Sequence, residues 1–236
     1  MDAESRVGWL SGIPRWSVVL WDFDGTVANT AVDVWISLEK TAQMFGRRFP
    51  DRLLRDSSNL SLPMTDICAT LIPPVDEGGV AAFEREVARQ YREVSKHENT
   101  ALYPGVAEAI TNLRRAGGKS FIVTNKPRPA LERILAIKGW GQLFDGWWCV
   151  NTQVAELKAK PNLIVQAIRA SKGKPSESVM VGDSAGDIAA AHEVGVSSIG
   201  VTYGDGDVSE LISEGPDYLV SDGRELPGIL FEGKSN

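Results

Sequence analysis

A short apolar segment near the start of the chain runs directly into two carboxylates, in the sequence Ser-Val-Val-Leu-Trp-Asp-Phe-Asp-Gly-Thr at positions 17–26. Its β-branched and aromatic residues, bounded by turn-forming residues, predict a buried strand. A strand that is apolar along its whole length suits a parallel sheet covered on both faces. Such sheets carry their functional groups at the carboxyl ends of the strands. Asp22 and Asp24 fall there, and their two-residue spacing can aim both side chains the same way.

Two carboxylates this close repel each other unless a cation neutralises them or one of them holds a proton. Oxygen ligands of this kind suit Mg²⁺, which keeps several water molecules and is often completed by substrate phosphate. A strand followed by an Asp-Gly turn would explain Asp24 and Gly25 without any chemistry, because both residue types favour turns. The functional interpretation therefore depends on complementary residues elsewhere in the chain.

The composition is that of an ordinary globular protein, with 236 residues of which 43% are apolar and 24% charged. This length allows one large domain or a core with an insert. The net charge of −6 argues against a nucleic-acid or anionic-membrane partner, so an anionic substrate would need local positive charge. We find no long apolar segment and no signal-peptide pattern, and we expect a cytoplasmic protein. Cys68 and Cys149 match no metal-binding spacing, and we expect two reduced thiols.

Helical periodicity dominates the chain after the first strand. Apolar residues recur at helical spacing over 31–45 and again over 76–97, with no strand signal between them. The segment 30–97 is too long for a simple crossover, so we predict an inserted helical subdomain there. Beyond it, strands are predicted over 120–125, 144–150, 178–183, 196–201 and 218–220, alternating with helices over 106–116, 129–138, 161–171 and 187–194. This alternation predicts an α/β fold with a parallel sheet and right-handed crossovers.

Three of the predicted strands end in polar residues. The polar residues at these strand ends are Asp22 with Asp24, Thr124 with Asn125, and Gly182 with Asp183. A lysine, Lys160, precedes a later helix. Phosphoryl transfer needs such a set. A carboxylate can attack phosphorus, a hydroxyl and backbone N–H groups can hold the phosphoryl oxygens, and a lysine can neutralise the remaining charge. Further carboxylates can complete a metal site.

Four motifs in order resemble those of the haloacid-dehalogenase-like hydrolase superfamily. They are Asp22-Phe23-Asp24-Gly25-Thr26-Val27, Val123-Thr124-Asn125-Lys126-Pro127, Lys160-Pro161, and Val181-Gly182-Asp183-Ser184-Ala185-Gly186-Asp187-Ile188. The resemblance extends from about Trp16 to Leu219, and two further segments, 103–106 and 201–204, are similar to phosphoglycolate-phosphatase-like members. It implies a Rossmann-like parallel-sheet core with helices on both faces, formed by residues 14–29 and 98–236. It also implies that residues 30–97 are a subclass I helical cap.

The resemblance implies a role for each matching residue. Asp22 matches the nucleophile, and Asp24 matches the general acid that protonates the leaving oxygen and later serves as base. The implied Mg²⁺ ligands are the Asp22 carboxylate, the backbone carbonyl of Asp24 and the Asp183 carboxylate, with Asp187 in support. The implied phosphate-binding groups are Thr124, Lys160 and the backbone N–H groups of Asn125 and Gly25.

Several charged or variant positions keep a second interpretation. Lys158 competes with Lys160 for the motif position, and we prefer Lys160 because Pro161 begins the next helix. Lys126 follows Asn125 and could add positive potential near the entrance of the site, but a solvated loop charge explains it at least as well. Two positions depart from the family pattern: Asn29, where members often have an acid, and Ser61, where they often have a glycine.

We expect a Mg²⁺-dependent phosphatase acting on a small phosphorylated metabolite, such as phosphoglycolate or a sugar phosphate, through an aspartyl-phosphate. A phosphomutase of the same superfamily uses the same two aspartates and remains an alternative, as does a non-catalytic phosphate-binding regulatory protein. Asp24 argues against a dehalogenase or a phosphonatase, because neither is expected to keep this acid. The oligomeric state, monomer or homodimer, stays open.

Overall fold

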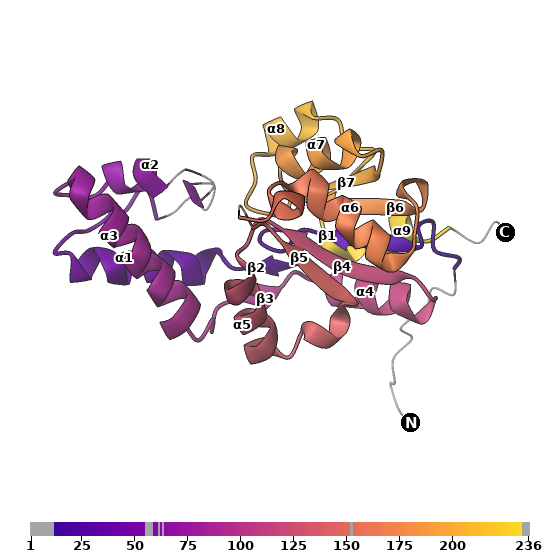
Figure 1. The fold of residues 1–236 in the computed structure, drawn as a ribbon, viewed down its shortest axis with the longest axis horizontal. Helices are drawn as coiled ribbons and strands as arrows, with labels where there is room; N and C mark the ends of the chain where they lie inside the picture. Colours follow the sequence, from indigo (N-terminus) through magenta and orange to yellow (C-terminus); the bar gives the residue numbers. More distant parts are fainter. Residues whose placement is uncertain (1–11, 55–58, 61, 63, 152, 233–236) are drawn as a thin grey trace, which may run out of the picture.

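The computed structural model describes residues 12–54, 59, 60, 62, 64–151 and 153–232, and its centre is a six-stranded parallel sheet (Figure 1). The strand order is β5 (Gly146–Cys149), β4 (Lys119–Thr124), β1 (Val18–Trp21), β6 (Ser178–Gly182), β7 (Ser197–Val201) and β8 (Tyr218–Val220). All five neighbouring pairs in this sheet run parallel. The predicted α/β fold is therefore confirmed.

The strand β1 occupies the middle of the sheet because every one of its residues can be buried. Trp21 pairs with Ile122 of β4 on one side and Val181 of β6 on the other. Alternate residues of the strand point to opposite faces, so Val19 and Trp21 join one hydrophobic cluster while Val18 and Leu20 join another. An uninterrupted apolar strand thus places the two following aspartates at the centre of the carboxyl edge.

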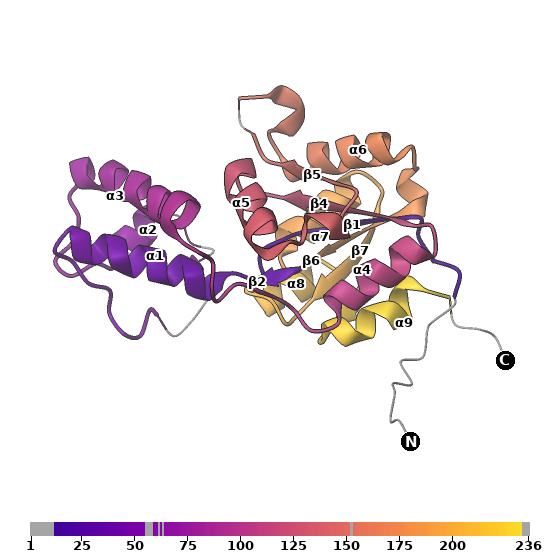
Figure 2. The same ribbon diagram turned by 90° about the horizontal axis from the view of Figure 1, so that it is seen from below.

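Helices cover both faces of the sheet, as the views in Figures 1 and 2 show. The first face is packed by α4 (Val106–Arg115), α5 (Arg128–Lys138) and α9 (Leu226–Leu230), and the second by α6 (Lys160–Ser171) and α7 (Ala185–Glu193). The helix α8 (Val208–Ser213) packs beside α7. Neither α8 nor α9 was predicted, because helices of six and five residues are too short to show a period.

A separate group of helices follows β1, and we call it the helical unit. It comprises α1 (Ala31–Met44), α2 (Met64–Ala69), α3 (Glu77–Arg89) and a π-helix, Gln90–Val94, that continues α3, together with the described residues between these helices. These helices have their own hydrophobic cluster, which includes Leu38 and Phe83, and they lie to one side of the sheet in both ribbon views. The predicted helix over 76–97 ends at Val94, because the backbone of Ser95 leaves the helical region at ψ 136°.

The two connections between the helical unit and the sheet lie side by side. Strands β2 (Ala28–Asn29) and β3 (Ala101–Leu102) form a short antiparallel ribbon. The buried carboxylate of Asp33 in α1 accepts hydrogen bonds from Asn99 Nδ2 at 3.0 Å and Thr100 Oγ1 at 2.6 Å. The segment that leaves the helical unit is thus tied to the helix that enters it.

Two further expectations concern the whole chain. Cys68 and Cys149 are buried free thiols, as expected. Among the described residues, no helix has both the length and the apolar character that a membrane crossing requires.

Candidate active site

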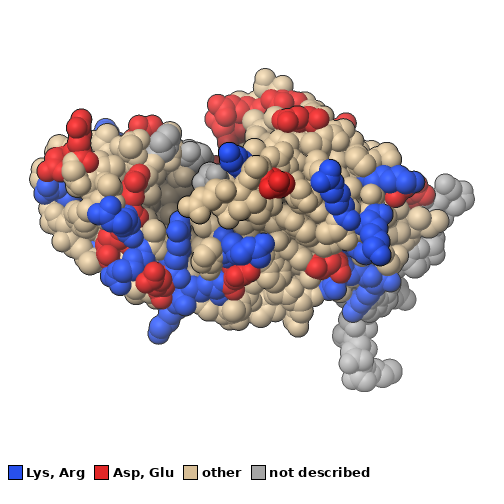
Figure 3. All heavy atoms as spheres, viewed as in Figure 1, with Lys and Arg blue, Asp and Glu red and all other residues tan. Residues whose placement is uncertain are grey.

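A cleft with a volume of about 280 Å³ opens at the carboxyl edge of the sheet, beneath the helical unit. The surface is hollowed between the helical unit and the α/β part (Figure 3). The residues that line the cleft are Asp22, Asp24, Thr30, Val34, Leu60, Thr124, Asn125, Lys126, Lys160, Asp183, Ser184, Asp205 and Gly206. Six of the eight residues predicted for the site are among them. Gly25 and Asp187 lie beside the cleft rather than in its lining.

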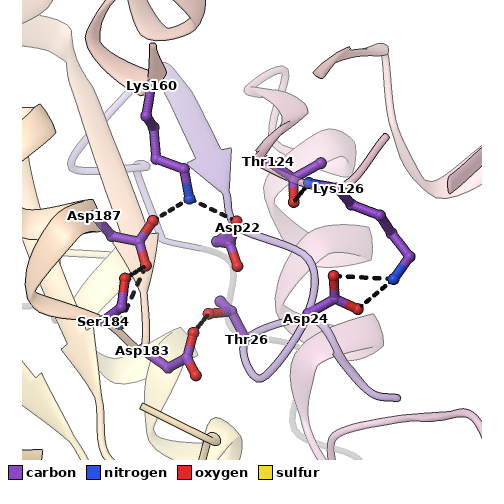
Figure 4. Close-up of polar contacts among 9 residues, drawn as sticks. All are labelled: Asp22, Asp24, Thr26, Thr124, Lys126, Lys160, Asp183, Ser184 and Asp187. Atoms are coloured by element: carbon purple, nitrogen blue, oxygen red, sulfur yellow. Dashed lines mark hydrogen bonds and ion pairs between the residues drawn. The ribbon is translucent and has the colours of Figure 1, made fainter. Parts of the chain in front are cut away.

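Asp22 follows β1 and stays in register with the sheet, since its N–H donates to the carbonyl of Val181 at 2.9 Å. Its carboxylate accepts a hydrogen bond from Lys160 Nζ at 2.7 Å (Figure 4). Burial raises the pKa of the Asp22 carboxyl to about 8, against the lowering effect of Lys160, and the nearby carboxylates of Asp187 and Asp183 raise it further. Further positive charge in the cleft would stabilise the carboxylate form of Asp22 and lower this pKa.

Asp183 follows β6 and is held by three donors. Thr26 Oγ1 donates to its Oδ1 at 3.0 Å, and the backbone N–H groups of Asp205 and Gly206 donate to its Oδ2 at 2.9 and 3.0 Å. Burial and the charge of Asp187 raise the pKa of Asp183 to about 6, although these hydrogen bonds oppose the rise. The donors fix the orientation of the carboxylate toward the cleft.

Asp187 lies at the start of α7 and serves as part of its capping box. Ser184 donates to Asp187 from its backbone N–H at 3.1 Å and from its hydroxyl at 2.7 Å. We expected this helix to begin at Asp187, whereas it begins at Ala185 because the capping residue is Ser184. The other oxygen of Asp187 accepts from Lys160. Asp187 therefore holds the lysine that also contacts Asp22.

Lys160 begins α6, with Pro161 in the first turn. Its side chain is 8% exposed and bridges Asp22 and Asp187. The neighbouring Lys158 is exposed and does not line the cleft. The structure therefore places Lys160, and not Lys158, among the aspartates.

Thr124 and Asn125 bring the second motif to the cleft at the end of β4. Thr124 is buried, and its hydroxyl accepts from the backbone N–H of Lys126 at 3.1 Å. Asn125 is exposed at the cleft surface. The expected phosphate contact of Gly25 finds no support, because the N–H of Gly25 donates to the carbonyl of Ala28 at 3.0 Å. Gly25 has φ +75°, and any Cβ there would collide with the Asp183 carboxylate, which explains the glycine.

Lys126 is the clearest residue that sequence reasoning undervalued. Its side chain is 5% exposed, and its ammonium donates to both carboxylate oxygens of Asp24 at 2.8 and 3.0 Å and to the Tyr91 hydroxyl at 3.0 Å. Burial alone would lower the pKa of Lys126, but Asp24 and Tyr91 raise it above its usual range. The interpretation as a solvated loop charge is therefore wrong, because Asp24 supplies the counter-charge that burial requires. Its partners, Asp24 and Tyr91, lie far from it in the sequence, so no local pattern indicated its burial.

Asp24 points away from the other aspartates, toward Lys126 (Figure 4). Its carboxylate also accepts from the hydroxyl of Thr30 at 2.6 Å. This orientation agrees with the implied metal site, in which Asp24 contributes its backbone carbonyl and not its carboxylate. The loop residues Asp205 and Gly206 were missed as well, although the repeated glycines over 204–206 mark a close backbone approach.

Three carboxylates could hold a cation here. One oxygen each from Asp22, Asp183 and Asp187 lies within 4.8 Å of the others, and all three residues are buried. In the part of the chain that the structure describes, one lysine, Lys160, contacts this group, so negative charge exceeds positive charge among these side chains. Hard oxygen ligands with excess negative charge fit a divalent cation. The residues present therefore suit the metal that the family resemblance implies.

The four motifs, the parallel sheet and the cleft define a hydrolase of the haloacid-dehalogenase type. The model of the family described as haloacid dehalogenase-like hydrolase matches residues 19–201, so the chain belongs to this family. It is 30% identical to a phosphoglycolate phosphatase of Agrobacterium fabrum, over 93% of this chain and 94% of the relative. It is 28% identical to a phosphoglycolate phosphatase of Pseudomonas fluorescens, over 92% of this chain and 80% of the relative.

A solved structure agrees with these relatives. It is the crystal structure of a predicted phosphoglycolate phosphatase from Haemophilus somnus, with a TM-score of 0.78 and 25% identity, covering 92% of this chain and 99% of the other. The family and the predicted enzyme class, a phosphoric monoester hydrolase of this superfamily, are therefore confirmed.

Proposed function

We propose that the protein is a Mg²⁺-dependent phosphatase that hydrolyses a small phosphomonoester through an aspartyl-phosphate on Asp22. The observation that carries the proposal is the convergence of Asp22, Asp183 and Lys160 on one cleft from three distant segments. The names of the relatives support phosphoglycolate as the first substrate to test. The proposal includes a cytoplasmic enzyme, monomeric or homodimeric, with no nucleic-acid or membrane partner.

In the first step, the Asp22 carboxylate attacks phosphorus while Asp24 gives a proton to the departing ester oxygen. Thr124, the N–H of Asn125 and Lys160 would hold the phosphoryl oxygens. In the second step, Asp24 takes a proton from a water molecule, which attacks the phosphorus of the aspartyl-phosphate and releases Asp22. Asp22, Asp183 and the carbonyl of Asp24 would hold Mg²⁺, which neutralises the gathered negative charge when bound.

We also propose that residues 30–97 act as a cap over a core of residues 14–29 and 98–236. The described residues Val34 and Leu60 of the helical unit line the cleft, which supports a role in excluding water during phosphoryl transfer. Ser61, one of the two departures from the family pattern, lies outside the described residues. Asn29, the other, is exposed in the ribbon.

The test is hydrolysis of p-nitrophenyl phosphate and 2-phosphoglycolate with Mg²⁺ and with a chelator. The wild-type protein should release phosphate only with Mg²⁺, and Asp22→Asn should lower kcat at least about 10³-fold, as loss of a nucleophile does in other enzymes. Asp51→Asn, an exposed aspartate of the helical unit, is the matched control and should keep full activity. Unchanged turnover by Asp22→Asn would contradict the proposal. Isomerisation of a hexose 1-phosphate without release of phosphate would show a mutase instead.

A further inference from the structure

Lys126 is a buried cation that the reaction proposed above does not use. It lies just beyond β4, lines the cleft, and is fixed by three acceptor atoms, two from Asp24 and one from Tyr91. An ammonium group has three N–H donors, so each has a partner and the position of Nζ is well determined. Tyr91 belongs to the π-helix of the helical unit, and its ring packs edge-on against His97 at 4.9 Å between ring centroids.

The position of Lys126 is set by the position of Asp24. If Asp24 serves the ester oxygen, the leaving group must lie against the Asp24 carboxylate. The Lys126 ammonium is 2.8 and 3.0 Å from the two oxygens of that carboxylate. A polar group one or two bonds beyond the ester oxygen therefore comes within reach of Lys126.

The two lysines of the cleft lie on opposite sides of it. Among the described residues that line the cleft, Lys126 and Lys160 are the cationic ones. Figure 4 shows Lys160 between Asp22 and Asp187, and Lys126 on the far side of Asp24. The described lining residues contributed by the segment that enters the helical unit and by the unit itself are Thr30, Val34 and Leu60, and these three carry no charge. One cation thus faces the place of the phosphoryl group, and the other faces the place of the leaving group.

We propose that Lys126 selects substrates whose leaving group carries a carboxylate, by pairing with that carboxylate beside Asp24. This inference rests on the proposed phosphatase function. A buried ammonium that loses its counter-charge is strongly disfavoured. When Asp24 turns its oxygens toward the ester, an anionic leaving group replaces the lost contact, whereas a neutral one leaves Lys126 without a partner carboxylate. Leaving groups of the hydroxy-acid type fit this arrangement, and neutral alcohols do not.

The test compares kcat/KM for two esters of the same size, 2-phosphoglycolate and 2-hydroxyethyl phosphate. They differ in a carboxylate against a hydroxymethyl group. The wild-type protein should prefer 2-phosphoglycolate about 10- to 100-fold, the range expected for a hydrogen bond to a charged group. Lys126→Met should reduce this preference to within about threefold, mainly by losing activity on the carboxylate ester. Lys126→Arg keeps the charge and should keep part of the preference.

Lys158→Met is the matched control, because it removes an exposed lysine close in sequence to the site and should leave the preference unchanged. The activity of Lys126→Met on 2-hydroxyethyl phosphate serves as the check that the variant is folded. Equal losses on both esters would show that Lys126 only supports Asp24, and would overturn the proposal. A wild-type protein that hydrolyses both esters equally well would overturn it too. Absence of turnover on either ester, and on p-nitrophenyl phosphate, would refute the phosphatase function itself.

Discussion

Replacing Asp33 with alanine should weaken the tie between the two connections of the helical unit. The Asp33 carboxylate is 3% exposed and accepts from Thr100 Oγ1 at 2.6 Å and Asn99 Nδ2 at 3.0 Å. Burial by itself raises the pKa of Asp33, but the hydrogen bonds from Thr100 and Asn99 lower it below its usual range, so the acceptor is charged. Each hydrogen bond to a charged group contributes about 1.5–3 kcal/mol. Losing the two side-chain hydrogen bonds should cost about 3–6 kcal/mol of the free energy of unfolding.

The measurement is urea unfolding at pH 8, followed by far-UV circular dichroism, together with the melting temperature. For a chain of this length, the expected loss corresponds to a fall in Tm of about 6–24 °C. Thr100→Val removes one of the two side-chain donors and should show about half of the loss. Glu98→Ala is the control, because it removes an exposed acid from the same segment. A loss below about 1 kcal/mol for Asp33→Ala would refute the role given to these hydrogen bonds.

Three further outcomes are expected. Gly204→Ala should lower kcat at least about 10-fold, because its Cβ would collide with the Gly25 carbonyl and displace the loop that holds Asp183; unchanged kinetics would contradict this. Trp21→Phe should cost about 1–2 kcal/mol in urea unfolding, because it removes the buried hydrogen bond from Trp21 Nε1 to a serine hydroxyl at 2.8 Å. Burial lowers the pKa of His97 to about 4, so the neutral ring is favoured in the folded state, and stability should fall as the pH drops from about 6.5 toward 4. His97→Asn, which tolerates the left-handed backbone at φ 53°, should show a shallower fall over the same interval.

The sequence predicted the structure best where a local pattern, such as an apolar run, directly determines the position of the segment in the fold. The apolar run before Asp22 could be assigned to a central strand because only such a strand buries both faces. The carboxyl ends of parallel strands share one edge, so the convergence of Asp22, Thr124 and Asp183 could be expected before any coordinates. These predictions needed periodicity, chain order and the family motifs.

The contacts of Lys126 could not be predicted in the same way. Its burial depends on Tyr91, which arrives from a π-helix that no local pattern announces. Gly25 shows the opposite case, because a plausible phosphate donor is occupied by a turn within its own loop. The burial of Lys126 depends on partners far away in the sequence, and the hydrogen bond of Gly25 depends on the closure of a single turn. Residue type and spacing do not encode either of them.

The ribbon of β2 and β3 has a consequence for how this architecture can vary. Ala28 pairs with Leu102 and Asn29 with Ala101, so the chain departs from the sheet and returns to it at the same point. Insertions, deletions or exchange of the residues between β2 and β3 leave the position of this ribbon on the sheet unchanged. The register of the six parallel strands, and with it the spacing of the aspartates, is then insulated from changes in the helical unit. The aspartates at the edge of the sheet and the residues of the helical unit can accordingly change separately within one polypeptide.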